Sequence, residues 1–443
     1  MEHFPKNSPG GIEPDGFSRR HFMKYLLAGS ALSASALHEL NAGIYQSILS
    51  LNQKYIEDES PDGAYWDAVR QFYLFEDKLI MMNNGTVGPM PKPVFNTLMK
   101  YFRTQVSNPF DVYNFLPAKK EEVREKLAEF INASPDEVSL TSNTTEGLNF
   151  VVHGLDLKQG DEVLVSAMEH PGSINPWRLK AKREGIVIKE IPLGLPPKNT
   201  EEIVQAFAAA VTPRTKMISV GHTVYISGLI TPIKELSKMA HEKGLLIMAD
   251  SAHGIGMISL NMKELGCDFF ASSPYKWLGA PTGIGLLYVR KEAQDKLWPT
   301  VVSSGWDTTA SARKYDPQGQ RADAMVYALG EAIDFMNHIG KVKVEKRIKT
   351  LAAYLKQGLS KIPGVKINTP LDPYLSAGLT AFSAQGIDNS RIVEYVRDKY
   401  NLVVRTIGGK EMAAVRVSTP IYISFKEVDL LLEGVNQLVR HKV

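Results

Sequence analysis

Short apolar runs alternate with amphipathic runs through the middle of the chain. Seven apolar runs predict strands, at 137–141, 162–167, 187–191, 216–220, 245–249, 269–271 and 284–289. The segments between them carry apolar residues at helical spacing, as at 145–153, 174–184, 201–210 and 233–242. Strand–helix alternation over about 150 residues predicts an α/β fold, with a mostly parallel sheet covered by helices on both faces.

The regions before this alternation predict an arm and the start of a large domain. Residues 37–82 contain helical pieces and form an N-terminal arm. The loop at 83–91 is dense in Gly and Pro and must follow a fixed path. Helical patterns at 94–102 and 119–131 then lead into the sheet.

The C-terminal part predicts a second, smaller domain. Two long helices are expected within 322–361, followed by short strands and helices that end in a helix at 427–440. We therefore place a large domain at 83–335 and a smaller α+β domain at 336–443.

The N-terminus predicts an export signal. Residues 18–24 read SRRHFMK, with Arg19 and Arg20 adjacent, and the apolar, small-residue stretch 25–37 follows. A cationic segment, a short apolar core and a small-x-small site at 34–36 are typical of a secretory signal, and the paired arginines indicate the twin-arginine route. We expect residues 1–36 to be this signal, the translocase to be a transient partner, and the protein to be periplasmic. The alternative is a surface helix with a chance arginine pair.

Composition narrows the function classes. A formal net charge of +3 without a Lys/Arg block argues against nucleic acid as a partner. Cys267 is the single cysteine, which excludes an intrachain disulfide framework, and no metal site is predicted. No apolar run reaches the roughly 20 residues that span a bilayer, so membrane integration is not expected.

A carboxylate and a lysine follow two successive predicted strands. The run 244–249 ends at Asp250, and the run 269–271 is followed by Lys276, which lies among Tyr, Trp, Pro and Gly residues. Ligands of open parallel sheets bind at the carboxyl ends of the strands. A partly buried lysine has a lowered pKa and suits Schiff-base chemistry, and a carboxylate can keep a pyridine nitrogen protonated. The pair predicts a pyridoxal phosphate (PLP) site.

Two further segments fit a PLP site. Thr144 and Thr145 stand between a predicted strand and a helix, where hydroxyls and free backbone amides bind phosphate. His170 follows the strand at 162–167 and could stack on the cofactor ring. Their other interpretations are a helix N-cap and a plain loop histidine.

From Asn83 to Val439 the chain resembles the class V aminotransferases, which are PLP enzymes of fold type I. The segment 249–290 resembles the family pattern D-x-A-H/Q … D-F … S-x-H-K-W-x-x-G-P-x-G-x-G. The resemblance implies a seven-stranded large domain, a smaller C-terminal domain and a homodimer. It implies that Lys276 forms the internal aldimine, Asp250 pairs with the ring nitrogen, and His170 stacks on the ring; these are the expected catalytic residues. The remaining expected cofactor contacts are His253, Thr144, Thr145, Ser273, Tyr275 and Gln320, and the expected substrate contacts are Arg416, Asn84 and Tyr225.

Departures from the family pattern refine the expected activity. Tyr225, Tyr275 and Gln320 stand where the family commonly has Asn, His and Thr. No cysteine follows Arg405, which disfavours a cysteine desulfurase. His253 and the loop at 83–88 resemble the isopenicillin N epimerase-like branch.

The sequence thus predicts an exported PLP enzyme, a transaminase or an epimerase, that acts on an amino acid or a peptidic amine. Alternatives are a PLP-dependent C–S lyase or desulfurase-like enzyme and a non-catalytic exported binding protein. Ser273-x-x-Lys276 also matches the nucleophile motif of penicillin-binding proteins, but no Lys-Thr-Gly or Lys-Ser-Gly follows it.

Overall fold

The computed structural model describes residues 34–55, 63–194, 196–303, 305–316, 319–408 and 412–441. Arg19 and Arg20 of the expected export signal lie outside these residues.

The large sheet confirms the seven predicted strands. They are β2 (Val138–Thr141), β3 (Glu162–Ser166), β4 (Val187–Ile191), β5 (Thr215–Gly221), β6 (Leu246–Asp250), β7 (Phe269–Ser272) and β8 (Gly285–Val289). Their order in the sheet is β2-β8-β7-β6-β5-β3-β4. The sheet is mostly parallel, and β8 runs antiparallel to both of its neighbours.

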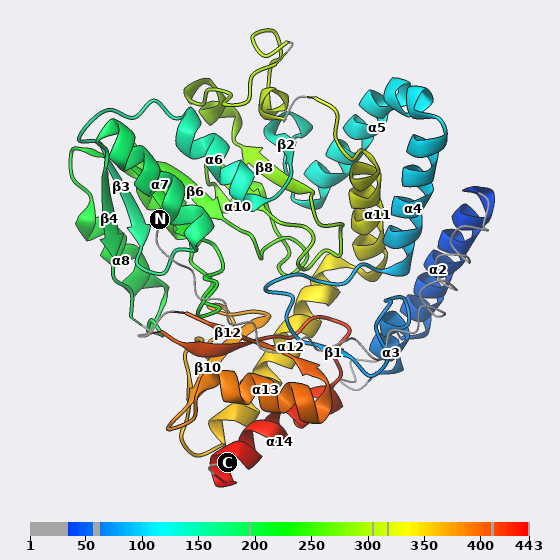
Figure 1. Ribbon diagram of the computed structural model, residues 1–443. Helices are drawn as coiled ribbons and strands as arrows, with labels where there is room; N and C mark the ends of the chain where they lie inside the picture. The colour runs from blue at the N-terminus through cyan, green and yellow to red at the C-terminus, as the bar shows by residue number, and fades with distance from the viewer. Residues whose placement is uncertain are drawn as a thin grey trace, which may run out of the picture.

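Helices cover both faces of this sheet (Figure 1). On one face lie α6 (Thr144–Gly154) and α7 (Pro171–Glu184), and on the other α8 (Thr200–Ala210) and α9 (Ile233–Glu242). Within β3, Val163 and Val165 pack in the same cluster as Trp177 of α7, whereas Leu164 packs in the same cluster as Phe207 of α8. Alternate side chains enter opposite layers, so a strand buried on both faces reads as a continuous apolar run.

A layer of long helices flanks the sheet. It comprises α2 (Ala34–Lys54), α4 (Lys92–Ser107), α5 (Pro109–Phe130) and α11 (Ala324–Ile339), and α11 packs against the other three. The short helices α3 (Ala64–Arg70) and α10 (Met262–Leu265) complete this part of the chain.

Helix α5 begins ten residues before the predicted start at 119 and runs through Pro117. Its first half exposes Phe110 and Tyr113, whereas Val123 and Leu127 of the second half are buried. Only the second half therefore has the amphipathic pattern that identifies a helix in sequence.

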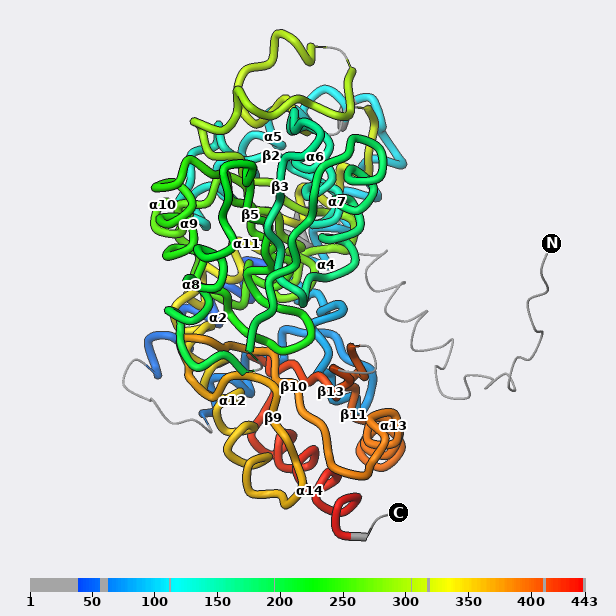
Figure 2. Tube along the Cα trace, turned by 90° about the vertical axis from the view of Figure 1, so that its left-hand side faces the viewer, coloured from blue at the N-terminus to red at the C-terminus, as the bar shows by residue number. Residues whose placement is uncertain are grey.

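The C-terminal region forms a second sheet below the first (Figures 1 and 2). Its antiparallel order is β12-β13-β10-β9, from strands Arg405–Ile407, Ala414–Ser418, Leu379–Ala384 and Val365–Ile367. The helices of this region are α12 (Lys341–Ser360), α13 (Asn389–Tyr400) and α14 (Phe425–His441). Gly340 separates α11 from α12.

The N-terminal arm is tied to the C-terminal region by a two-stranded parallel pair, β1 (Ile80–Met81) with β11 (Leu402–Val403). The loop at 83–91, which is rich in Gly and Pro, follows β1. The pairing of β1 with β11 places this Gly/Pro loop between the two sheets. Among the described helices, none combines the length and the apolarity needed to cross a membrane.

Candidate active site

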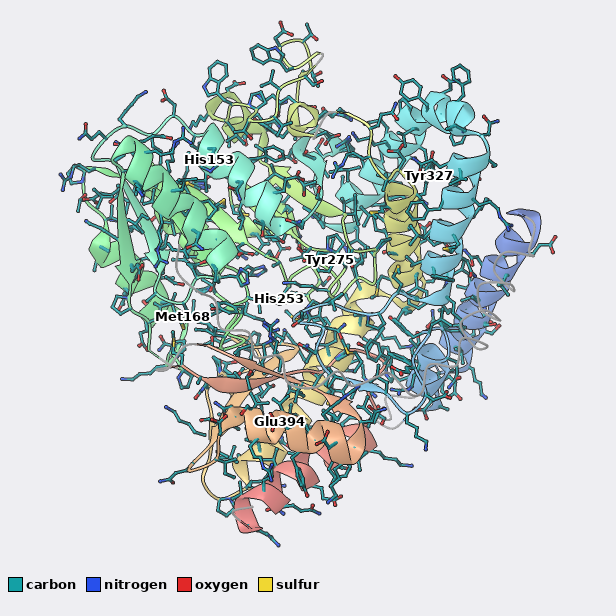
Figure 3. The ribbon with its side chains drawn as sticks, viewed as in Figure 1. His153, Met168, His253, Tyr275, Tyr327 and Glu394 are labelled. Carbon is teal, nitrogen blue, oxygen red and sulfur yellow. The ribbon has the colours of Figure 1, made fainter. Side chains whose placement is uncertain are left out.

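The candidate site lies where the strand order of the large sheet reverses. The chain passes from β3 outward to β4 and then back to β5 on the other side of β3, and crevices for ligands form at such switch points. A cavity lies at the carboxyl ends of these strands. Figure 3 shows His253 and Tyr275 between the large sheet and the C-terminal sheet. The cavity is lined by nine of the predicted site residues, namely Thr144, Thr145, His170, Tyr225, Asp250, His253, Ser273, Tyr275 and Lys276.

Lys276 lies in the tight turn that follows β7. The backbone N–H of Lys276 donates to the Ser273 carbonyl at 3.1 Å. Burial lowers the pKa of the Lys276 amine to about 8, and the nearby Asp250 carboxylate offsets part of this effect. A substantial fraction of this amine is therefore neutral near pH 8, which a nucleophilic amine requires.

The Gly/Pro loop after β1 holds the Lys276 turn in place. Asn84 Nδ2 donates to the Lys276 carbonyl at 2.9 Å, and Asn84 Oδ1 accepts from the Tyr422 hydroxyl. Gly88 N–H donates to the Tyr275 carbonyl at 3.0 Å. A Cβ on Gly88 would lie 2.1 Å from the Lys276 carbonyl oxygen, so only glycine fits this approach. These contacts make Asn84 a positioning residue for the Lys276 turn. Its expected contact with the substrate stays a prediction.

Asp250 is buried at the end of β6. Its Oδ1 accepts from the Ala252 N–H at 3.1 Å, and no described cation lies within ion-pair distance of its carboxylate. Burial raises the pKa of Asp250, and the charge of Lys276 partly opposes the rise. A buried carboxylate without an ion-pair partner is suited to a cationic ring nitrogen.

His253 is buried beside Asp250, and its Nδ1 accepts from the Trp277 indole N–H at 3.4 Å. Burial lowers the pKa of His253 well below its usual value. The neutral ring therefore carries its proton on Nε2, which can donate to an acceptor oxygen.

Hydroxyl groups gather at the N-terminus of α6. Thr144 N–H donates to Ser273 Oγ at 3.1 Å, and the two hydroxyls of Thr144 and Ser273 lie 2.7 Å apart. A Cβ on Gly172, in the first turn of α7, would lie 2.9 Å from Thr145 Oγ1. Two helix N-termini and three hydroxyls therefore meet at one end of the cavity, an arrangement that binds phosphate.

His170 is the N-cap of α7, and its Nδ1 accepts from the Gly172 N–H at 3.0 Å. Its ring meets the ring of Tyr225 edge-on, with centroids 4.8 Å apart. Tyr225 follows β5, so this contact joins the start of α7 to the segment after β5.

Glu169 is a cavity residue that the sequence analysis did not single out. Its carboxylate accepts from Ser166 Oγ at 2.6 Å, Gly221 N–H at 3.0 Å and Ser173 Oγ at 3.2 Å. It thereby joins the ends of β3 and β5 to α7. Burial raises the pKa of Glu169 to about 7. Its position three residues after the buried strand β3 was the available signal.

Arg416 of β13 approaches the cavity from the second sheet and is buried. Its guanidinium donates to the Tyr225 carbonyl at 3.1 Å and to Thr86 Oγ1 at 3.2 Å, while its Nε has no hydrogen-bond partner. A Cβ on Gly85 would lie 2.6 Å from the Arg416 guanidinium carbon. The glycine therefore leaves room for the cation beside the loop.

Gln320 is the predicted cofactor contact that does not line the cavity. It is exposed on the segment that precedes α11. The resemblance assigns this position to the phosphate of a partner subunit, and that role stays a prediction.

A larger cavity lies among α2, α4, α5 and α11. Two of its acidic groups already have partners within the protein. Glu331 accepts from Asn41 and Thr97, and Asp334 pairs with Lys126 at 2.7 Å. The described residues contain no group of three or more His, Cys, Asp or Glu side chains that could hold a metal ion.

The cavity beside Lys276 fits PLP by its chemistry. Lys276 would hold the aldehyde carbon, Asp250 would face the ring nitrogen, and His253 Nε2 could donate to a ring oxygen. Thr144, Thr145 and Ser273 supply donors for the phosphate. The unpaired Asp250 carboxylate is the clearest sign that a cationic partner belongs there.

The fold and this site together define a PLP-dependent α/β enzyme. The family pattern described as Aminotransferase class-V matches residues 81–431, so the chain belongs to this family and its cofactor is PLP.

The chain is similar to two curated proteins in sequence and to a solved structure in fold. An isopenicillin N epimerase of Amycolatopsis lactamdurans is 30% identical over 392 residues, covering 84% of this chain and 98% of that protein. A probable cysteine desulfurase of Halalkalibacterium halodurans is 29% identical over 388 residues, covering 81% and 93%. A solved structure of C-DES, with glycine covalently linked to its PLP cofactor, has a TM-score of 0.76 at 23% identity and covers 83% of this chain and 98% of that one.

Proposed function

We propose that this protein is an exported PLP-dependent enzyme that acts at the α-carbon or the amino group of an amino acid or a peptidic amine, as a transaminase or an epimerase. The position of its single cysteine favours a transaminase or an epimerase over a cysteine desulfurase. Cys267 is fully buried before the first residue of β7, whereas Lys276 follows the opposite end of that strand. Burial raises the pKa of the Cys267 thiol to about 12. This thiol stays protonated and cannot reach a substrate in the cavity.

The side chains of the cavity can perform the proton transfers of either reaction. PLP, when bound, withdraws electrons from the bonds around the substrate α-carbon. Lys276, with its lowered pKa, takes the α-proton. An epimerase also needs a proton donor on the face opposite Lys276, and the candidate is Tyr225, which lines the cavity and keeps its hydroxyl proton at neutral pH. Arg416 would hold the substrate carboxylate with a bidentate hydrogen bond.

The reaction type is tested with a panel of amino acids and short peptides in heavy water. Release of a keto acid with loss of the yellow colour supports a transaminase. Deuterium at the α-carbon with loss of chirality and unchanged colour supports an epimerase. The third outcome is the formation of sulfide, pyruvate or alanine from β-substituted substrates, with neither keto-acid release nor deuterium exchange. This outcome would contradict the proposal and indicate a lyase.

The lysine that holds the cofactor is tested by borohydride reduction and peptide mapping. Lys356 is a matched internal control, because burial lowers its pKa to about 8 as well, and its amine hydrogen-bonds to Ser376 Oγ and the Pro370 carbonyl away from the cavity. The cofactor mass should be fixed to the peptide that contains Lys276 and be absent from the Lys356 peptide. A label on another lysine, or no label, contradicts the assignment.

Export is proposed on the SRRHFMK segment of the sequence. Replacing Arg19 and Arg20 with Lys should leave the precursor in the cytoplasm, because the translocase reads paired arginines. The control replaces the exposed arginines Arg391 and Arg397 with Lys. Mature protein outside the inner membrane in the Arg19/Arg20 variant would refute this route.

A homodimer is proposed on the family resemblance and on an apolar surface at the α4–α5 corner. Val106, Phe110 and Tyr113 are 84%, 71% and 60% exposed there. Contiguous exposed apolar side chains are typical of association surfaces.

A further inference from the structure

Two arginines face each other across the small sheet. Arg405 of β12 is the direct antiparallel neighbour of Arg416 of β13. Directly opposed side chains of an antiparallel pair point to the same face of the sheet, and like charges in such a pair destabilise it. Because Arg416 is also buried, this repulsion is only partly screened by water.

The two guanidinium groups share one neutral acceptor. Arg405 Nη1 donates to Thr86 Oγ1 at 3.1 Å and Arg416 Nη2 donates to the same oxygen at 3.2 Å. The Thr86 hydroxyl donates its own proton to Asn83 Oδ1 at 3.0 Å. The donor and both lone pairs of this hydroxyl are therefore used, and no negative charge is supplied.

Among the described residues, no carboxylate lies within ion-pair distance of Arg405 or Arg416. Burial lowers the pKa of Arg416 to about 10, and the charge of Arg405 is the next cause. The Nε of Arg416 is buried without a hydrogen-bond partner. Arg405 is exposed. The pair thus combines one deep and one outer cation, both without a counter-charge, and the charges of both act on the cavity residue His170.

We propose that the substrate is an α-amino acid with a second carboxylate, which Arg405 binds while Arg416 binds the α-carboxylate. This inference rests on the proposed function and specifies its substrate class. One carboxylate would neutralise only one of two adjacent cations, whereas a dicarboxylate neutralises both. Arg405 then determines specificity without contacting the reacting atoms.

The test measures binding by calorimetry, with the PLP-loaded protein and acids that lack an amino group. Succinate, glutarate and adipate are compared with monocarboxylates of the same chain length. The best dicarboxylate should bind about tenfold more tightly than its monocarboxylate, which is the contribution of one charge-assisted hydrogen bond. Arg405→Gln should abolish this preference, and Arg416→Gln should weaken both ligand types. Arg391→Gln, which changes an exposed arginine of α13, should leave both affinities unchanged.

A second measurement uses amino-acid substrates. Arg405→Gln should raise KM about tenfold for dicarboxylic amino acids, leave kcat nearly unchanged, and leave KM for neutral amino acids unaltered. Absence of a dicarboxylate preference in the wild type, or its persistence in Arg405→Gln, overturns the inference. Failure of the proposed function can be distinguished from failure of this inference. The first would appear as missing cofactor on Lys276 or missing chemistry at the α-carbon. The second is read by calorimetry, which needs no turnover.

Discussion

At the scale of single residues, burial gives the site its chemistry. Lys276 and Asp250 are common residue types, and both have shifted pKa values because their charged forms have lost water. Burial thus increases the neutral fraction of the Lys276 amine. It also destabilises the Asp250 carboxylate, which a cation nearby would stabilise. Two predictions separate these effects.

Asp250→Asn should keep the cofactor but lose most of the activity. The amide is similar in size and can still accept from Ala252 N–H, yet it cannot hold the ring nitrogen protonated. We expect kcat to fall about a hundredfold or more, the scale of removing one charge-stabilising group from an active site. Absorbance at equal protein concentration checks cofactor content, and single-turnover assays check the rate. Full activity in this variant would contradict the role of Asp250.

The rate at which apoenzyme takes up PLP should follow the neutral fraction of Lys276. With a pKa of about 8, the neutral amine becomes about tenfold more abundant from pH 7 to pH 9 and then levels off. A lysine with an ordinary pKa near 10.4 would gain about a hundredfold over the same range and continue to rise. Stopped-flow absorbance from pH 6.5 to 10 distinguishes the two profiles. A curve without a plateau would show that burial does not lower this pKa.

At the scale of elements, the loop after β1 is the part of the site where an added side-chain atom would cause the most severe clash. It lies against the Lys276 turn at Gly88 and beside the Arg416 guanidinium at Gly85. The parallel pairing of β1 with β11 holds the start of this loop against the C-terminal region. A change in the loop should therefore alter the cofactor site without touching Lys276 itself.

Gly88→Ala should destabilise the protein by about 1–3 kcal/mol and weaken PLP binding. Its Cβ would lie 2.1 Å from the Lys276 carbonyl oxygen, so the loop or the turn must move. Gly43→Ala is the matched control, since Gly43 lies within α2 with no atom near the added Cβ. We expect it to stabilise the protein by about 0.5–1 kcal/mol. Urea unfolding and PLP titration of both variants provide the check, and equal behaviour of the two would refute the packing argument.

At the scale of the whole molecule, the exposed α4–α5 corner and the exposed Gln320 segment are unexplained by a single chain. A second copy of the chain would account for both features. It would cover the α4–α5 corner, and Gln320 of the first copy would contact the phosphate site of the second. The proposed homodimer therefore has a direct test.

Phe110→Glu should shift the protein toward monomer. Burying a charge in an apolar interface is costly, and a central contact of this kind contributes about 2 kcal/mol or more, equivalent to about a 30-fold rise in the dimer dissociation constant. Tyr374→Glu is the control, because Tyr374 is 84% exposed in the C-terminal region. Sedimentation equilibrium of the three proteins gives the result. A wild-type monomer, or a dimer insensitive to Phe110→Glu, contradicts the proposal.

The layers of the fold could be predicted from the sequence, and so could the positions of Asp250 and Lys276 at the ends of two strands. Strands buried on both faces appear in the sequence as apolar runs. Asp250 and Lys276 follow two such runs. The strands and their ends could therefore be located from the local pattern. The order of the strands does not follow from that pattern, because pairing between β3 and β5 joins segments separated by β4 and α8.

The contacts that cross between the two sheets follow from the tertiary packing and not from the local pattern. Asn84 supports the Lys276 turn from 192 positions away, and Thr86 meets Arg405 and Arg416 from more than 300 positions away. The first half of α5 was missed because its exposed aromatic residues carry no helical period. Local sequence encodes burial and propensity, whereas long-range packing determines which side chain meets a given carbonyl or cation.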